Sequence, residues 1–527
     1  MTPAFGEGRR QSGILLHFTS LPSRYGIGDM GPAAFHWIDR LRDAGQAWWQ
    51  VLPLGATGYG NSPYQPLSSF AGNSLLISPD ALIDDGLVSV RDCEGSSFPA
   101  DVVDFNAVTT FKRGLIRNAW NNFCRGGRRD LRDVYEKFRI DQAGWLEDYA
   151  LFRALKTRYN GAYYVEWPSD LVYREPAAMA RARRELKDEI DQITFAQFLF
   201  FRQAGRLKRY ARRRGLGLIG DLPFFVSPDS SDVWANPEFF DLDANRRARF
   251  VAGVPPDYFA AQGQLWGNPV YNWGALKNAD YRWCLDRLRA LLEFVDVIRL
   301  DHFRGFVAAW QVPAGAPTAE TGTWVSGPGV DFFAAVRSEF GGMPFIAEDL
   351  GMITPDVLAL RDSFGLPGMR VMQFGFDGNP ENPHLPHTWT NHAAGYTGTH
   401  DNNTTRGWFE ALPDCQKQLV REYVGLSAKD SHGIGAALMR SAWPSAAGLT
   451  IAPLQDVLDL GAEARMNVPG RAQCNWRWRW ADSTPSEQAF RWLAELTSTS
   501  GRARDPIPPT VAAMAQRNPE QILLTVQ

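Results

Sequence analysis

Hydrophobic residues along this chain fall into short runs that are separated by longer segments with helical spacing. Residues 13–18 and 48–54 are apolar runs closed by turn-forming residues, which is typical of buried strands. Between them, residues 31–45 carry Ala34, Trp37 and Leu41 three or four positions apart, which predicts an amphipathic helix. The alternation of strand and helix indicates parallel strands joined by crossover helices.

The same alternation continues through most of the chain and sets the predicted fold class. We expect helices at 279–294, 330–340, 356–362, 415–424 and 433–443, and eight strands at 13–18, 48–54, 218–226, 297–301, 344–351, 369–374, 395–403 and 449–454. Eight apolar strands alternating with helices predict an α/β protein with a closed (β/α)8 (TIM) barrel. The competing architecture is an open doubly wound sheet, which requires a glycine-rich phosphate motif after the first strand, and residues 17–20 do not form one.

The strand pattern is interrupted twice, and these interruptions define the predicted domains. Residues 80–215 are expected to form a mostly helical insertion after the second strand, whereas 12–79 and 216–527 form the barrel, without a separate C-terminal β-sandwich domain. Residues 241–292 are expected to be an insertion between the third and fourth strands. Its part from 254 to 269 is loop-like and rich in proline and aromatic residues, which suggests a functional lid. The alternative is a small subdomain that packs its own aromatic residues.

Composition and charge narrow the classes of partner. The 527 residues carry a formal net charge of −3, which does not favour nucleic acid or an anionic membrane as partner. The basic stretch 206–215 lacks the accompanying features of a nucleic-acid site and is expected to be a solvated helix face. No apolar run approaches the ~20 residues that span a bilayer, and no signal peptide is visible. Five dispersed cysteines without C-x-x-C spacing argue against a disulfide framework and predict a reducing compartment, the cytoplasm.

Acidic residues stand at the C-terminal ends of several predicted strands. Asp221 ends the third strand, Asp301 the fourth and Glu348 the fifth, and the pair His400–Asp401 lies at the end of the seventh. In a barrel these ends converge on one mouth. Arg299 and Asp301 lie two positions apart and therefore share a face of their strand, where the cation favours the ionised carboxylate. Each acid alone could instead cap a helix, and the Arg–Asp pair could be purely structural.

The residue types at the predicted mouth restrict the chemistry. A Schiff-base aldolase requires a lysine at a strand end, and none of the predicted strands ends in one. His17 is the only histidine on the first strand and is a poor basis for a zinc site. We therefore predict neither a metal nor a cofactor. Paired carboxylates remain, and they are the groups that cleave glycosidic bonds. The 19 Trp, 32 Phe and 15 Tyr residues suit both a large core and sugar stacking.

Several motifs resemble those of the 4-alpha-glucanotransferases, also called amylomaltases or disproportionating enzymes, of glycoside hydrolase family 77. The matching motifs cover nearly the whole chain and lie at 13–17, 58–65, 220–223, 253–273, 299–304, 347–351, 398–402 and 465–470. The segments Pro-Pro-Asp-Tyr-Phe to Trp-Gly-Asn-Pro and Arg-Met-Asn-x-Pro-Gly are specific to this family within the wider alpha-amylase clan. Two positions depart from the family pattern: Phe18 stands where Pro is usual, and Asn403 where Asp is usual.

The resemblance implies a role for each candidate residue. Asp301 is expected to be the nucleophile, Glu348 the general acid/base and Asp401 the stabiliser of the transition state. The residues expected to bind substrate are Tyr64, Asp221, Arg299 and His400 at the cleaved sugar, Tyr258, Phe259 and Trp266 as lid aromatics over the acceptor side, and Asn467. Asn403 is neutral and does not supply the negative charge that the usual Asp would supply beside Asp401.

The implied reaction is transfer of alpha-1,4-glucan segments to glucose or maltooligosaccharide acceptors through a covalent glycosyl-enzyme. Retention of stereochemistry predicts a separation of about 5–5.5 Å between the Asp301 and Glu348 carboxyl groups. A negative Asp301 is expected to raise the pKa of Glu348 before attack. Two other hypotheses remain: a plain alpha-glucan hydrolase of the same clan, and an inactive glucan-binding protein. Donor length preference and oligomeric state are not encoded in any recognisable motif.

Overall fold

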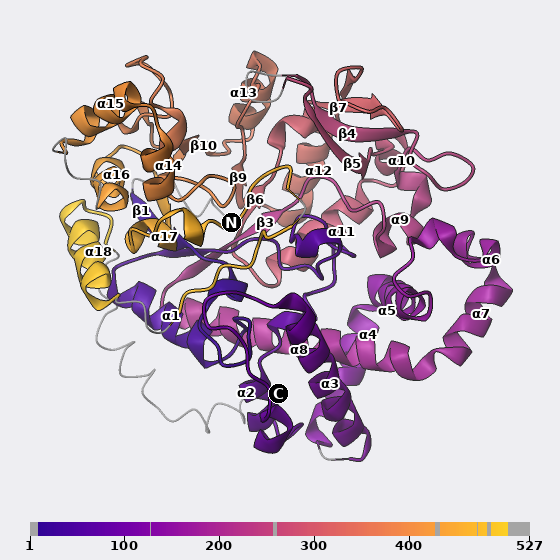
Figure 1. Cartoon of the computed structure of the whole chain (residues 1–527). Coiled ribbons are helices and arrows are strands. Elements are labelled where there is room, and N and C mark those ends of the chain that lie inside the picture. The colour runs from indigo at the N-terminus through magenta and orange to yellow at the C-terminus, as the bar shows by residue number, and fades with distance from the viewer. Residues whose placement is uncertain are drawn as a thin grey trace.

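The computed structural model describes residues 9–126, 128–256, 261–426, 433–471, 473–481 and 486–503. Eight parallel strands form a closed barrel in the order β1-β12-β11-β10-β9-β6-β3-β2 (Figure 1), which confirms the predicted (β/α)8 fold and excludes the open sheet. The barrel strands are β1 (Gln11–Leu15), β2 (Trp48–Gln50), β3 (Gly217–Leu222), β6 (Val297–Leu300), β9 (Phe345–Ala347), β10 (Gly368–Val371), β11 (Ala393–Tyr396) and β12 (Leu449–Pro453).

The barrel interior is filled by alternate residues of these strands. In β6, Val297 belongs to the interior cluster, whereas Ile298 and Leu300 pack outward in the cluster that includes the surrounding helices. Because successive strand residues face opposite sides, Arg299 shares the interior face with Val297. The strand pattern thus directs the one charged residue of β6 toward the barrel axis.

Helices cover the outside of the barrel between its strands. They are α1 (Pro32–Asp43), α11 (Arg282–Leu292), α12 (Gly329–Phe340), α13 (Pro355–Ser363), α14 (Thr405–Ala411), α15 (Asp414–Val424), α16 (Ile434–Ala442), α17 (Leu454–Val457) and α18 (Glu487–Thr499). Proline stands at the first position of α1 and α13, where it removes no intrahelical hydrogen bond. The helices α12 and α15 are followed by Gly341 and Gly425, which adopt the left-handed conformation that favours glycine.

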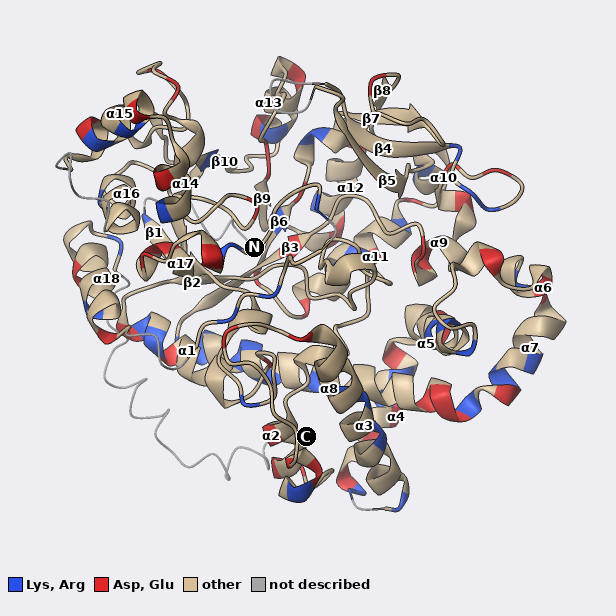
Figure 2. Cartoon of the chain, in the orientation of Figure 1, with Lys and Arg blue, Asp and Glu red and all other residues tan. Residues whose placement is uncertain are grey.

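The chain between β2 and β3 is helical. It contains α2 (Pro79–Asp84), α3 (Phe105–Cys124), α4 (Asp130–Asp141), α5 (Ala143–Arg158), α6 (Ser169–Val172), α7 (Pro176–Glu185) and α8 (Lys187–Arg213). The domain limits at 80 and 215 stay a prediction. Figure 2 shows basic and acidic residues interspersed along these helices. At the end of α8, Lys208 donates to the backbone oxygens of Leu292 and Val295, and Arg212 pairs with Asp296, so part of the basic stretch fastens α8 to the chain before β6.

The segment between β3 and β6 differs from the prediction. The predicted loop 254–269 begins at the last residue of β4 (Phe250–Val254) and contains β5 (Gln264–Pro269). These two strands form a four-stranded antiparallel sheet with β7 (Ala308–Pro313) and β8 (Thr323–Ser326). Short helices α9 (Ser231–Ala235) and α10 (Trp273–Asn278) flank it. The prediction of a loop was wrong for β5, which pairs with β4 as a hairpin. β4 in turn pairs with β7, which lies far along the chain. Among the described helices, none combines the length and hydrophobicity of a membrane-spanning segment.

Candidate active site

The third, fourth and fifth barrel strands place three acids beside one another. Asp221 in β3 pairs in register with Arg299 in the adjacent β6, and Asp301 and Glu348 directly follow β6 and β9. The Glu348 backbone N–H donates to Leu300 at 3.0 Å, so the ladder between β6 and β9 continues to the acid itself. The C-terminal strand ends of such a barrel form its active-site mouth.

Arg299 joins two of these carboxylates. Its Nη1 lies 2.9 Å from Oδ1 and Oδ2 of Asp221 and 2.9 Å from Oδ1 of Asp301. Burial opposes the charge on Arg299, but attraction to Asp221 and Asp301 holds the pKa of the guanidinium well above its usual value. Burial raises the pKa of Asp221, and Arg299 counteracts that effect. The predicted Arg–Asp pair therefore exists and extends to a third charged group.

This triple ion cluster predicts a large loss of stability when its cation is removed. In Arg299→Met the buried Asp221 carboxylate loses its counter-ion, and we expect the free energy of unfolding to fall by about 3–5 kcal/mol. Burial raises the pKa of Asp221 in the folded state above its unfolded value. The loss in the free energy of unfolding is therefore complete at pH values above the folded-state pKa, and it becomes smaller at lower pH, where Asp221 takes up a proton. Urea denaturation as a function of pH measures this deficit.

The matched control is the double variant Asp221→Asn with Arg299→Met, in which the amide needs no counter-ion. It should recover part of the lost stability. A deficit below about 1 kcal/mol that does not change with pH, as expected for a surface pair, would contradict the prediction.

Glu348 is held by backbone donors at both oxygens. The N–H of His302 donates to Oε2 at 2.7 Å, and the N–H of Leu350 donates to Oε1 at 3.0 Å. His302 has a φ of 46°, a conformation uncommon for a residue with a side chain, and it directly follows Asp301. Burial raises the pKa of Glu348 to about 8, with the Asp301 charge as a smaller contribution in the same direction. The predicted direction is right, but burial rather than Asp301 is its main cause.

Asp401 lies outside the strand to which the sequence assigned it. The strand β11 ends at Tyr396, so His400 and Asp401 occupy the loop that follows it. Asn467 Nδ2 donates to Asp401 Oδ1 at 2.6 Å, and Arg465 Nη2 donates to the Asp401 backbone oxygen at 2.7 Å. These contacts bring the Arg-Met-Asn motif against Asp401. Asn403, two residues further on, accepts the Thr404 N–H at 3.0 Å.

Aromatic rings line the site between the acids. Tyr64 stacks on His400 with ring centroids 5.0 Å apart, and its hydroxyl donates to Asp221 Oδ2 at 2.7 Å. Burial, reinforced by the Asp221 charge, raises the pKa of Tyr64 well above its usual value, so it stays a neutral donor. Trp266 meets the ring of His302 edge-on at 4.9 Å. Tyr258 and Phe259 lie outside the described residues.

Trp476 is a site residue that the sequence reasoning missed. The centroid of its ring lies 5.9 Å from that of Tyr64 and 6.0 Å from that of His400, so Trp476 packs against this stacked pair. It is buried and has a φ of 64°, a strained conformation that requires support from its surroundings. The alternation of Trp and Arg over residues 476–480 is the sequence signal that could have drawn attention to it.

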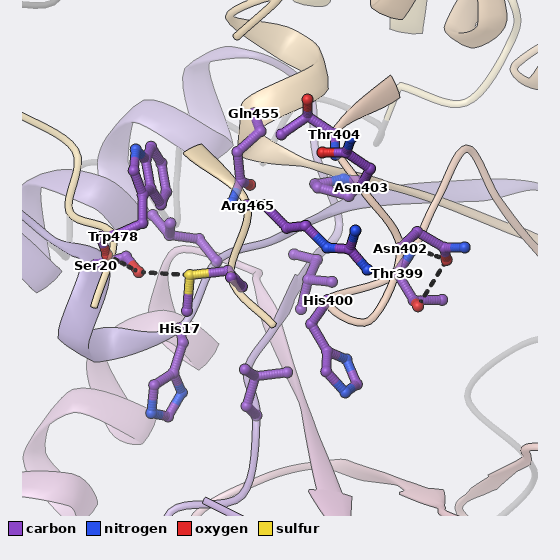
Figure 3. Close-up of a pocket in the computed structure, with 15 residues that line it drawn as sticks. His17, Ser20, Thr399, His400, Asn402, Asn403, Thr404, Gln455, Arg465 and Trp478 are labelled. Atoms are coloured by element: carbon purple, nitrogen blue, oxygen red, sulfur yellow. Dashed lines mark hydrogen bonds between the residues drawn. The ribbon is translucent and has the colours of Figure 1, made fainter. Parts of the chain in front are cut away.

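A small pocket adjoins the Asp401 loop. Figure 3 shows His17, Ser20 and Trp478 on one side and His400, Asn402 and Arg465 on the other. Burial, with a contribution from His400, lowers the pKa of His17 to about 3, so its imidazole is neutral. Among the described residues, no group of three His, Cys, Asp or Glu side chains is arranged to hold a metal ion.

The barrel is closed, and its mouth holds three carboxylates, a bridging arginine and stacked aromatic rings. This arrangement defines a (β/α)8 enzyme that acts on glycosidic bonds. The sequence profile of family 77, described as 4-alpha-glucanotransferase, matches residues 16–484. The chain therefore belongs to the 4-alpha-glucanotransferase family, glycoside hydrolase family 77, as its motifs predicted.

Similar proteins support this membership along nearly the whole length of both chains. A 4-alpha-glucanotransferase of Synechocystis sp. is 46% identical over 94% of this chain and 98% of its own. One from Thermus thermophilus is also 46% identical, over 93% of this chain and 99% of its own. The structure of an amylomaltase from Streptococcus agalactiae in complex with acarbose superposes with a TM-score of 0.91 at 36% identity, covering 94% of this chain and 100% of that one.

Proposed function

We propose that this protein is a 4-alpha-glucanotransferase that moves segments of alpha-1,4-glucan from a donor chain to glucose or a maltooligosaccharide. The observation that carries the proposal is the pairing of an Arg299-bound Asp301 with a Glu348 whose pKa burial raises to about 8. At neutral pH a retaining glycosidic reaction needs one carboxylate as nucleophile and one carboxyl group that still holds its proton as acid. The names of the relatives at 46% identity support transfer as the outcome.

The proposed mechanism assigns one step to each acid. Asp301 attacks the anomeric carbon while Glu348 gives its proton to the departing glycosidic oxygen, so the bond to the leaving chain breaks as the ester to Asp301 forms. The transition state carries positive charge on the sugar, which the carboxylates of Asp301 and Asp401 offset. Glu348 then takes the proton of an acceptor hydroxyl, which displaces Asp301 and restores the original configuration. The separation of about 5–5.5 Å between the two carboxyl groups stays a prediction of this mechanism.

The contacts of the surrounding residues support their proposed substrate roles. Tyr64 and His400 present a stacked, buried pair beside Asp221 and Arg299, which suits the sugar at the cleavage point. Asn467 bonds Asp401 directly, and Trp266 lies over His302, next to the proposed nucleophile. We also propose that the described strands β4 and β5 help to exclude water on the acceptor side and so favour transfer over hydrolysis. The acceptor-side roles of Tyr258 and Phe259 stay a prediction. The five free cysteines support action in a reducing compartment, the cytoplasm.

Incubation with maltotriose as the only carbohydrate tests the proposed reaction. A glucanotransferase uses maltotriose as both donor and acceptor, and the products are expected to form a ladder of longer and shorter oligosaccharides together with glucose. Product analysis by chromatography over time distinguishes the alternatives. Only shorter sugars would indicate a hydrolase, and an unchanged substrate would indicate a glucan-binding protein without activity.

A further inference from the structure

A buried carboxylate behind the site contacts both ends of the loop that carries His400 and Asp401. We infer that Asp456 is a positioning residue for Asp401, acting through this loop and without touching the substrate. The inference rests on the proposed role of Asp401. Asp456 lies in α17, directly after β12, and only 2% of its surface is exposed.

The hydrogen bonds of Asp456 bracket the loop. Its Oδ2 accepts from Thr397 Oγ1 at 2.6 Å and from Thr405 Oγ1 at 2.7 Å, and its Oδ1 accepts from the Thr405 N–H at 3.0 Å. Thr397 is the first residue after β11, and Thr405 is the first residue of α14. Both threonines are fully buried. One carboxylate therefore fixes the point where the loop leaves the barrel and the point where it enters the next helix.

The rest of the loop has its own local supports. Thr399 N and Oγ1 both donate to Asn402 Oδ1 at 2.9 Å, which closes a turn around His400 and Asp401 (Figure 3). Gln373 Nε2 donates to the Asn403 backbone oxygen at 3.1 Å. The turn can thus keep its shape while its ends move. Its placement over the mouth depends on Arg465 and Asn467, which bond Asp401 directly, and on its two ends, which have Asp456 as a common partner.

The three donors explain why this position is a carboxylate. Two hydroxyls and one backbone N–H all point at Asp456, and an ionised carboxylate accepts from all of them without offering a donor of its own. An amide would turn its NH2 group either toward both threonine hydroxyls or toward the Thr405 N–H, which is itself a donor. Burial raises the pKa of Asp456, and the hydrogen bonds from Thr397 and Thr405 counteract that effect. Charge-assisted bonds of this kind are among the stronger hydrogen bonds in proteins.

A matched pair of variants at Thr405 separates the hydroxyl from the bulk of the side chain. Thr405→Val removes the hydroxyl donor and keeps the shape and the backbone N–H, whereas Thr405→Ser keeps the donor. We expect Thr405→Val and Asp456→Asn to lower kcat by about 10- to 100-fold with little change in KM, because a misplacement of about 1 Å at a catalytic group can cost about 10²-fold. Thr405→Ser is expected to stay near wild type. Thermal unfolding identifies any variant that does not fold.

A double-mutant cycle with Asp401 gives a readout that a merely structural role would not produce. With α-maltosyl fluoride as donor, Asp456→Asn is expected to lower the rate in the wild-type background and to have almost no further effect in Asp401→Ala. Equal fold-losses in both backgrounds would overturn the inference, as would Thr405→Val with wild-type kcat. Wild-type activity in Asp401→Ala itself would instead contradict the proposed role of Asp401, so the two failures are distinguishable.

Discussion

Replacing Asp301 with Asn is expected to lower transfer between maltooligosaccharides by about 10⁴-fold or more, equivalent to ~5.5 kcal/mol of transition-state stabilisation. The amide is a poor nucleophile and carries no charge to offset the oxocarbenium-like transition state. The change is nearly isosteric, and the amide oxygen can still accept from Arg299, which lies 2.9 Å from Asp301 Oδ1. The loss should therefore be chemical and not structural.

Rates of glucose release and of ladder formation from maltotriose measure this effect, and the thermal unfolding midpoint serves as the control for folding. Asp362→Asn is a matched control, because this exposed acid on α13 pairs with Arg361 on the same helix and lies in no proposed site. It should leave the rates unchanged. Substantial turnover by folded Asp301→Asn would remove the nucleophile assignment and with it the double-displacement mechanism.

The barrel was predictable because its signals are local. Each strand is a short apolar run whose residues alternate between two faces. The rule that parallel strand ends share one mouth predicts from the sequence alone that Asp221, Asp301 and Glu348 lie close together. The contact of Arg299 with Asp301 follows from the period-two facing of their strand. The boundaries were less accurate: β11 ends at Tyr396, and not at residue 403, because the turn around Asp401 is closed by side-chain hydrogen bonds of Thr399 and Asn402.

The second sheet could not be predicted in the same way. Its strand β4 pairs with β7, with Gly253 opposite Trp310, and these residues are far apart in the chain. All four residues of β8 are exposed, so no alternation of apolar and polar positions marks that strand. Pairing over such distances depends on tertiary contacts that a local pattern does not contain. The same limit applies to Asp456, whose role comes from contacts with Thr397 and Thr405, and to Trp476, whose role comes from its contact with Tyr64.

Replacing Glu348 with Gln is expected to lower kcat/KM for maltotriose by about 10²–10⁴-fold, the usual contribution of a general acid/base. In the wild type, the folded-state pKa of Glu348 is raised to about 8, so the proton needed by the leaving oxygen is present below that pH and is lost as the pH rises through it. Activity should therefore fall on the alkaline side. Glu348→Gln lacks this titrating group and should lose the alkaline limb of the pH–rate profile.

A donor that needs no proton separates the two steps of Glu348. Fluoride departs from α-maltosyl fluoride without general acid help, so Glu348→Gln should still form the ester to Asp301, whereas the acceptor hydroxyl then lacks the base that Glu348 supplies. The covalent intermediate should accumulate and be visible as a mass increase of one maltosyl group, and it should be absent when Asp301→Asn is added. Two results would assign the acid/base role to a different residue. One is a pH–rate profile of Glu348→Gln that keeps both limbs. The other is the absence of a trapped adduct in a Glu348→Gln variant that still consumes α-maltosyl fluoride.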